Sequence, residues 1–299
     1  MRLFDTAARK VVPFEPGPVV KMYVCGITPY DSTHLGHEAT YLAYDLLIRR
    51  LEELGHEVRM VRNVTDVDDS ILPKARELGV PYLDLAAAEI ERFAGDPRFV
   101  QVMVRGDTES EWGDRKYWPI YQACEASDFV AMCHVGGTPG NRYRGSGAPS
   151  YYLEQHVWLH MPVERLAMSL ICEGVFDQYP RLRVALVEAC LTWAGPLQWA
   201  MDAAYEVAGA DAPRLRKLPS EYFREHFWLS TQPIEEPDNP RHLAQSIEFA
   251  QMTDRVMFSS DYPHWDFDSP VKALPAAMPA AMRSKIMGEN ATRLYAKRL

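Results

Sequence analysis

The first third of the chain alternates apolar runs of strand length with amphipathic stretches. The apolar runs cover 21–25 and 57–64, and a turn rich in Gly, Thr, Pro and Asp follows the first of them. Between the runs, a helical stripe passes through Ala43, Leu47, Leu51 and Leu54 and stops at Gly55. The spacing predicts a strand–helix–strand unit whose helix ends at a left-handed glycine. Two further helical patterns follow, at 70–78 and 82–93.

The pattern changes after the Gly-Asp-Pro turn at 95–97. Apolar runs of strand length now recur between long connections with helical patterns, at 99–104, 129–134, 183–188, 226–230 and 255–261. Strands that alternate with helices predict an α/β fold with a parallel sheet covered on both faces. We place a boundary at this turn, so that residues 1–96 and 97–299 form two parts. Because each part needs its own core, we expect few apolar contacts between them.

Composition and charge exclude several classes of protein. The chain has 299 residues, of which 47% are hydrophobic, and a net charge of −9 without a basic cluster, so no nucleic-acid partner is expected. No apolar run approaches the ~20 residues that cross a bilayer. The N-terminus lacks the charged-then-apolar layout of a signal peptide, so we expect none. The five cysteines include no CxxC pair and are typical of reduced thiols. We expect a cytoplasmic protein with no membrane partner.

Three of the downstream strands end in a residue that could bind a metal ion. These residues are His134, Glu188 and Asp261. The carboxyl ends of parallel strands meet at one edge, so we expect the three side chains to cluster there. A histidine with carboxylates suits metal-dependent hydrolysis, in which one carboxylate takes a proton from water. The alternative is a structural histidine and an aspartate that forms a turn.

A pair of histidines opens the helix of the N-terminal unit, in the sequence His34-Leu-Gly36-His37. Backbone N–H groups at a helix start favour a phosphate, and the turn that contains Thr28 leaves further donors free. Two histidines there could stabilise the charge that develops during attack on a phosphate. The alternative is that they are polar residues filling the first turn of the helix.

The wider sequence around these histidines resembles the cysteinyl-tRNA synthetase family, in particular its offshoot, the cysteine ligases of mycothiol biosynthesis. The residues that carry the resemblance are 25–31, 34–37 and 63–69. It implies a partial Rossmann-like nucleotide-binding segment at 1–96, with ATP bound by Thr28, His34, Gly36 and His37. It also implies that Cys25 is a zinc ligand. The family's other zinc ligands and its Lys-Met-Ser-Lys-Ser loop are not recognisable in this sequence. The alternative is therefore that Cys25 is a small buried residue at the end of a strand.

The downstream part resembles the second amidohydrolase family, whose members are metal-dependent hydrolases and decarboxylases on a distorted TIM barrel. The matching motifs lie at 133–137, 169–176, 187–193, 258–265 and 286–291. The resemblance implies that His134 and Asp261 bind a divalent metal, with zinc expected, and that Glu188 stands where many relatives carry histidine. The family's first-strand Asp-x-His or His-x-His element is missing. Five strands cannot close a barrel, so we expect an incomplete TIM-barrel-like sheet and a weakly bound ion.

These observations lead to three functional hypotheses. The first is a metal-dependent hydrolase that acts on a small organic molecule, with catalytic roles for Asp261 and Glu188. The second is an ATP-dependent cysteine ligase. The third is a non-catalytic fusion of two truncated enzymes that self-associates through its exposed strand edges, which would make it a homo-oligomer.

Overall fold

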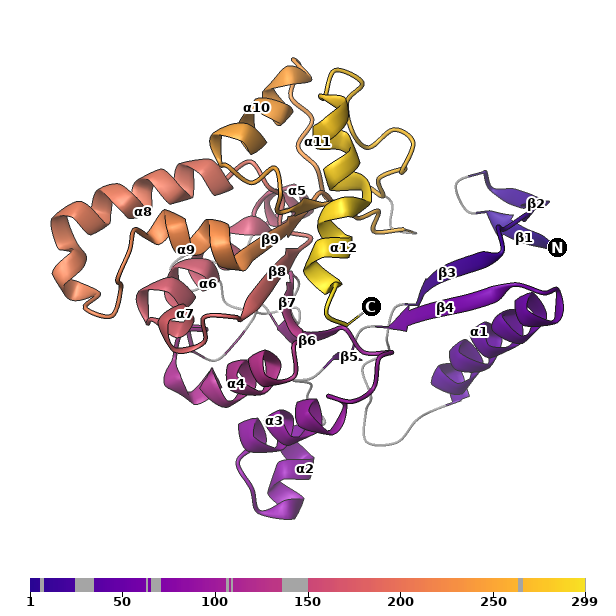
Figure 1. The fold of residues 1–299 in the computed structure, drawn as a ribbon, viewed down its shortest axis with the longest axis horizontal. Helices are drawn as coiled ribbons and strands as arrows, with labels where there is room; N and C mark the ends of the chain where they lie inside the picture. Colours follow the sequence, from indigo (N-terminus) through magenta and orange to yellow (C-terminus); the bar gives the residue numbers. More distant parts are fainter. Residues whose placement is uncertain are drawn as a thin grey trace.

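The computed structural model describes residues 1–5, 8–24, 35–62, 64–65, 71–105, 108, 110–135, 150–262 and 266–298. Its N-terminal portion holds an antiparallel hairpin, β1 (Arg2–Asp5) with β2 (Lys10–Pro13). Two parallel strands follow, β3 (Val19–Val24) and β4 (Glu57–Arg62), joined through helix α1 (Leu35–Glu53). The predicted strand–helix–strand unit is therefore confirmed, and Figure 1 shows it projecting to one side of the main body.

A second sheet forms the centre of the main body, and all of its strands run parallel. Its order is β10-β9-β8-β7-β6-β5, so neighbours in the sheet are also neighbours along the chain. The strands are β5 (Val64–Thr65), β6 (Gln101–Arg105), β7 (Val130–His134), β8 (Arg183–Val187), β9 (Phe227–Ser230) and β10 (Val256–Met257). The parallel α/β architecture is confirmed, whereas its description as an incomplete barrel stays a prediction.

Helices connect and cover these strands (Figure 1). They are α2 (Ile71–Leu78), α3 (Tyr82–Arg92), η1 (Arg115–Tyr117), α4 (Trp118–Ala126), α5 (Tyr152–Val157), α6 (His160–Cys172), α7 (Val175–Gln178), α8 (Ala194–Ala208), η2 (Gly209–Asp211), α9 (Pro219–His226), α10 (Arg241–Phe249), α11 (Ala280–Ser284), η3 (Lys285–Glu289) and α12 (Asn290–Tyr295). Among the helices that the structure describes, none is both long and apolar enough to span a membrane.

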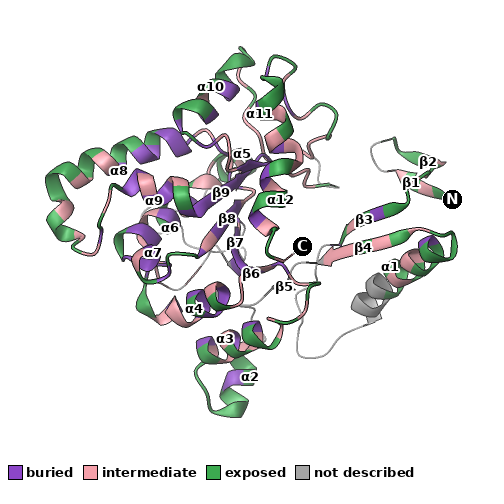
Figure 2. Cartoon of the chain, viewed as in Figure 1, coloured by how far each residue is buried: buried purple, intermediate pink, exposed green. Residues whose placement is uncertain are grey.

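Both faces of the central sheet are buried, as Figure 2 shows for its strands. Because side chains alternate along a strand, Ala131 and Cys133 of β7 join the larger core under the surrounding helices. Val130 and Met132 point to the other face, where they pack in a smaller cluster with Leu294 of α12. The C-terminal helix thus covers the face that the connecting helices leave open.

Apolar packing crosses the predicted boundary at 95–97, so the expectation of few such contacts was wrong. Ala86 and Ile90 of α3 lie in the same buried core as Val102 of β6. The two-residue strand β5 also comes from the N-terminal part and pairs with β6. Helix α3 packs against α4 of the part that follows it, so its apolar stripe is buried within the shared core. The division into 1–96 and 97–299 itself stays a prediction.

The far C-terminus holds the chain around this boundary in place. The Arg298 guanidinium donates to the carbonyl oxygens of Ala94, Asp96 and Phe99 at 2.6–3.0 Å. It also lies over the ring of Phe129, 4.3 Å from the centroid, which is a cation–π contact. One arginine therefore ties the segment before β6 to the last turn of the chain.

The helix stripe of the N-terminal unit is less buried than the sequence predicts. Leu51 is buried against the small β3–β4 sheet, whereas Ala43 is exposed and Leu54 lies beyond the end of α1 with 43% of its surface exposed. The two-stranded sheet is too narrow to cover a whole helix face. Gly55 does adopt the predicted left-handed conformation, with φ of 89°.

Substitution of Ile90 tests whether α3 belongs to the core of the main body. We expect Ile90→Ala, at a side chain 3% exposed, to lower the free energy of unfolding by about 3 kcal/mol, because it leaves a cavity. Urea unfolding followed by tryptophan fluorescence measures this. Leu46→Ala, at a position 65% exposed on α1, is the control and should leave that transition unchanged. An unchanged transition in Ile90→Ala would show that α3 is not part of this core.

Candidate functional site

His134 ends β7 at the carboxyl edge of the central sheet. Its Nε2 atom lies 2.9 Å from Oε2 of Glu188, and Nδ1 is hydrogen-bonded to the carbonyl oxygen of Val135. Strand β8 is the direct neighbour of β7, with His134 in register with Val187. Glu188, the residue after Val187, is therefore brought next to the imidazole, as the sequence analysis predicted from the ends of the two strands.

The backbone at Glu188 turns sharply out of the sheet. Its φ is 62°, in the left-handed region that side-chain-bearing residues rarely adopt. The Glu188 N–H donates to the Ser230 hydroxyl at 3.0 Å, and Ser230 at the end of β9 is 3% exposed. The Ser230 hydroxyl at the end of β9 therefore fixes the backbone conformation that directs the Glu188 carboxylate at the end of β8.

Asp261 follows β10 and has the same unusual backbone, with φ of 51°. Left-handed conformations at residues other than glycine cost about 1–3 kcal/mol and gather at functional sites. The negative charge of Asp261 also acts on His134, where it raises the pKa. Two of the three predicted residues are thus strained, and both of these act on the imidazole of the third.

Opposing effects set the pKa of His134. Burial lowers it, but the hydrogen bond and charge of Glu188, the Val135 carbonyl and the charge of Asp261 together outweigh burial, so the pKa is raised above its usual value. Both ring nitrogens face oxygen acceptors, which only the doubly protonated imidazolium can satisfy. The Glu188 carboxylate beside Nε2 therefore favours the protonated imidazolium.

The separation of these two atoms allows a test of whether a cation fits between them. Two ligands at about 2.1 Å from one ion lie about 3.0 Å apart at a right angle and about 3.4 Å apart at a tetrahedral angle. The observed 2.9 Å is close to these separations, but it is also the ordinary length of a hydrogen bond, so it does not distinguish the two angles. In the part of the chain that the structure describes, no group of three or more His, Cys, Asp or Glu is arranged to hold a metal. The pair fits a divalent ion, but the three predicted residues do not form a ready-made three-ligand centre.

Most of the predicted N-terminal residues lie outside the described part of the chain. This applies to Cys25, Thr28 and His34. Gly36 and His37 lie in the first turn of α1, which begins at Leu35. The histidine that ends the motif is thus at a helix start, as predicted, and the roles of these residues in binding ATP or zinc stay predictions.

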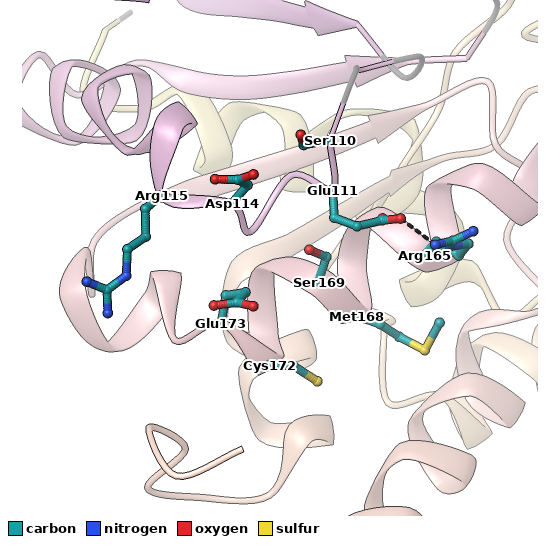
Figure 3. A pocket seen from close by; sticks show the side chains of 9 residues that line it. All are labelled: Ser110, Glu111, Asp114, Arg115, Arg165, Met168, Ser169, Cys172 and Glu173. Atoms are coloured by element: carbon teal, nitrogen blue, oxygen red, sulfur yellow. Dashed lines mark hydrogen bonds and ion pairs between the residues drawn. The ribbon is translucent and has the colours of Figure 1, made fainter. Parts of the chain in front are cut away.

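A groove of about 730 Å³ lies elsewhere, between the segment before α4 and helix α6. Figure 3 shows Glu111 and Arg165 paired within it, and Arg214 donates to the carbonyl of Glu173 at 2.9 Å. Glu111 and Arg165 neutralise one another in this groove, and it contains none of the strand-end residues. We therefore place the site at the carboxyl edge of the sheet and not in this groove.

Several residues that shape the carboxyl edge were missed by the sequence analysis. Glu235 accepts hydrogen bonds from the backbone of Leu191 and from the backbone and hydroxyl of Thr192, which anchors the loop after Glu188. His156 of α5 lies 3.4 Å from Asp266. The Asp-Tyr-Pro-His-Trp-Asp run at 261–266 could have indicated Asp266 from the sequence. No pattern in the sequence around Glu235 indicates which residues it contacts.

Comparison with known proteins shows the family of this chain. The family described as Amidohydrolase matches residues 78–297, which is most of the chain. The chain belongs to the amidohydrolase family. A second family, described as the class I (C) tRNA synthetase catalytic domain, matches residues 11–109 of this amidohydrolase. Both predicted resemblances are therefore confirmed.

The solved structures similar to this chain include aromatic-acid decarboxylases. 5-Carboxyvanillate decarboxylase from Sphingomonas paucimobilis has a TM-score of 0.58 and 22% identity, over 87% of this chain and 72% of that one. Dihydroxybenzoic acid decarboxylase from Polaromonas sp. JS666, with bound manganese and 2-nitroresorcinol, has a TM-score of 0.57 and 19% identity, over 95% and 98%. At such identities the likeness concerns the fold alone.

The N-terminal segment has curated relatives of another kind. The L-cysteine:1D-myo-inositol 2-amino-2-deoxy-alpha-D-glucopyranoside ligase of Mycobacterium ulcerans is 56% identical over 103 residues, which is 34% of this amidohydrolase. The ligase of Streptosporangium roseum is 52% identical over the same length. The chain spans about a quarter of the length of these relatives, 25% in each case.

Removing the Glu188 charge tests the electrostatics of the pair. In metal-free protein we expect Glu188→Gln to lower the pKa of His134, because burial then acts without the opposing carboxylate. NMR titration of the imidazole measures it, with Glu164→Gln as a control that should leave His134 unchanged.

The same shift makes stability depend on pH. The folded-state pKa is raised above the unfolded value of ~6.5, so the stabilisation is fully present below that pH and is lost as pH rises through the folded pKa. A pKa of His134 that is equal in the wild type and in Glu188→Gln would contradict the contact.

Proposed function

We propose that this chain is a metal-dependent hydrolase of the amidohydrolase family that acts on a small organic molecule at the carboxyl edge of its central sheet. The observation that carries the proposal is the 2.9 Å contact between His134 and Glu188, at adjacent strand ends. Strained backbone at Glu188 and Asp261 supports it, because strain is kept where side-chain direction matters to function.

Each of the three residues has a role in this proposal. His134 and Glu188 hold the divalent ion, and the Val135 carbonyl fixes the imidazole so that Nε2 faces it. A bound ion supplies Lewis acidity toward a polarised substrate oxygen. Asp261 would accept a proton from the attacking water, because its charge acts on the same imidazole.

The types of ligand bear on the identity of the ion. Imidazole suits zinc, whereas carboxylates suit manganese and magnesium, and two carboxylates accompany one histidine among the strand-end residues. We therefore propose manganese in place of the zinc that the sequence predicts. The manganese in two decarboxylases of similar fold is consistent with this choice.

Metal titration tests the proposal directly. Wild-type protein should bind one manganese ion weakly, and His134→Ala should reduce the affinity about 100-fold by removing a ligand. Isothermal titration with manganese and, in parallel, zinc measures both affinities. His160→Ala is the control, because His160 is bonded to Glu164 within α6. Manganese affinity that is the same in His134→Ala and wild type would refute the site.

A second candidate function rests on the 56% identity between the N-terminal segment and the cysteine ligases. We propose that the segment binds ATP with its triphosphate at the start of α1, where Gly36 and His37 lie. Thr28 and His34 of the same motif complete this proposed site. The cysteine–ligase reaction and a zinc ion at Cys25 are part of the same candidate function.

Substitution of His37 separates this candidate from a purely structural helix start. We expect His37→Ala to weaken ATP binding about tenfold, by loss of one hydrogen bond to a charged phosphate. His56→Ala is a matched control at the other end of the helix, where His56 is bonded to the Gly17 carbonyl at 2.9 Å. Fluorescence titration with a labelled ATP analogue gives both affinities. Equal ATP affinity in His37→Ala and wild type would exclude the proposed triphosphate site.

A further inference from the structure

A second polar cluster lies on the same edge of the sheet and plays no part in the proposed metal site. Gln232, directly after β9, is 1% exposed and donates from Nε2 to Oδ2 of Asp266 at 3.1 Å. The same carboxylate oxygen lies 3.4 Å from Nε2 of His156 on α5. Three chain segments thus converge on Asp266.

Two acceptor atoms of the segments after β9 and β10 are buried without a hydrogen bond, and the second belongs to a carboxyl group on which the charge of Asp266 acts. They are Oε1 of Gln232 and Oδ2 of Asp268. Turning the Gln232 amide over would not help, since its oxygen would then face the Asp266 carboxylate. A buried acceptor without a donor costs about 1–3 kcal/mol, so both atoms favour a group that brings N–H or O–H donors.

The charge of the surroundings selects among such groups. The described segments after β8, β9 and β10 carry Glu188, Glu235, Glu236, Asp261, Asp266 and Asp268. Over 188–193, 231–240, 258–262 and 266–270 they include neither Lys nor Arg. Burial, with the charges of Glu236 and Asp266, raises the pKa of Asp268 to about 6. A cation would relieve this repulsion, and an anion would add to it.

We propose that Gln232, Asp266 and Asp268 form a subsite for a protonated amino group on the small-molecule substrate. An ammonium has three donors, which match the two orphaned acceptors and the Asp266 carboxylate. The subsite extends the proposed function, because it assumes that the substrate lies at this edge. It gives that substrate a cationic nitrogen, unlike the aromatic acids named in the structures of similar fold.

Three probes of one shape but different charge test the subsite. Benzylamine, benzyl alcohol and benzoate are titrated into the full chain at pH 7.5, and their affinities are followed by protein NMR. We expect benzylamine to bind at least about tenfold more tightly than benzyl alcohol, as a charge-assisted hydrogen bond would give. Benzoate should not bind. Benzylamine should also lower the pKa of Asp268, because a cation stabilises the ionised carboxylate.

Matched variants locate the binding. Asp268→Asn, which keeps the side-chain shape, should weaken benzylamine binding about tenfold, whereas Asp238→Asn, at an exposed position in the segment after β9, should not. Asp266→Asn gives a second test should Asp268→Asn fail to fold. Equal affinity for the three probes, preference for benzoate, or no benzylamine binding because water alone satisfies the acceptors would each overturn the proposal.

The outcome is separable from that of the proposed function. Benzylamine binding without manganese binding supports the subsite and removes the metal-dependent hydrolase. Manganese binding at His134 without benzylamine binding removes the subsite alone. Repeating the titration with manganese present shows whether both groups can be bound at once.

Discussion

The central parallel sheet must be covered on both faces, and the C-terminal helix supplies the second cover. Parallel strands are apolar on both sides, so an open face would expose Val130, Met132 and Trp228 to water. Leu294 of α12 packs on these residues, and Arg298 then ties the end of the chain to the segment before β6. The order of the strand ends, and with it the candidate site, depends on this cover.

A well-packed sheet makes it energetically acceptable to hold strained residues at its edge. Glu188 and Asp261 each adopt a left-handed backbone that costs about 1–3 kcal/mol, and the costs are offset by the buried strands beneath them. Ser230 and Glu235 hold the turn at Glu188 by hydrogen bonds from the next strand end. The direction of the Glu188 carboxylate toward His134 is thus fixed by tertiary contacts rather than by the local sequence.

Much of the fold could be predicted because the apolar runs are continuous and well separated. The run at 129–134 became β7 and that at 183–188 became β8, within one residue. The run at 255–261 gave only the two residues of β10, because Phe258 bonds to Ile286 of η3 instead of continuing the sheet. The run at 57–64 is shared between two sheets, a choice of partner that local pattern does not encode.

The same contrast holds for the site. The meeting of His134 with Glu188 followed from adjacent strand ends, but the Ser230 hydroxyl acts across 42 positions and carries no local signal. Likewise, a shared core across 95–97 could not be read from two family resemblances, since each resemblance describes only its own ancestral packing.

The account depends most on an ion lying between two named atoms. Crystals grown with manganese chloride, with anomalous diffraction recorded at the manganese edge, would locate it. We predict one anomalous peak between Nε2 of His134 and Oε2 of Glu188, within about 2.0–2.3 Å of each. A peak elsewhere in the chain, or the His134–Glu188 contact intact with no manganese beside it, would contradict the account.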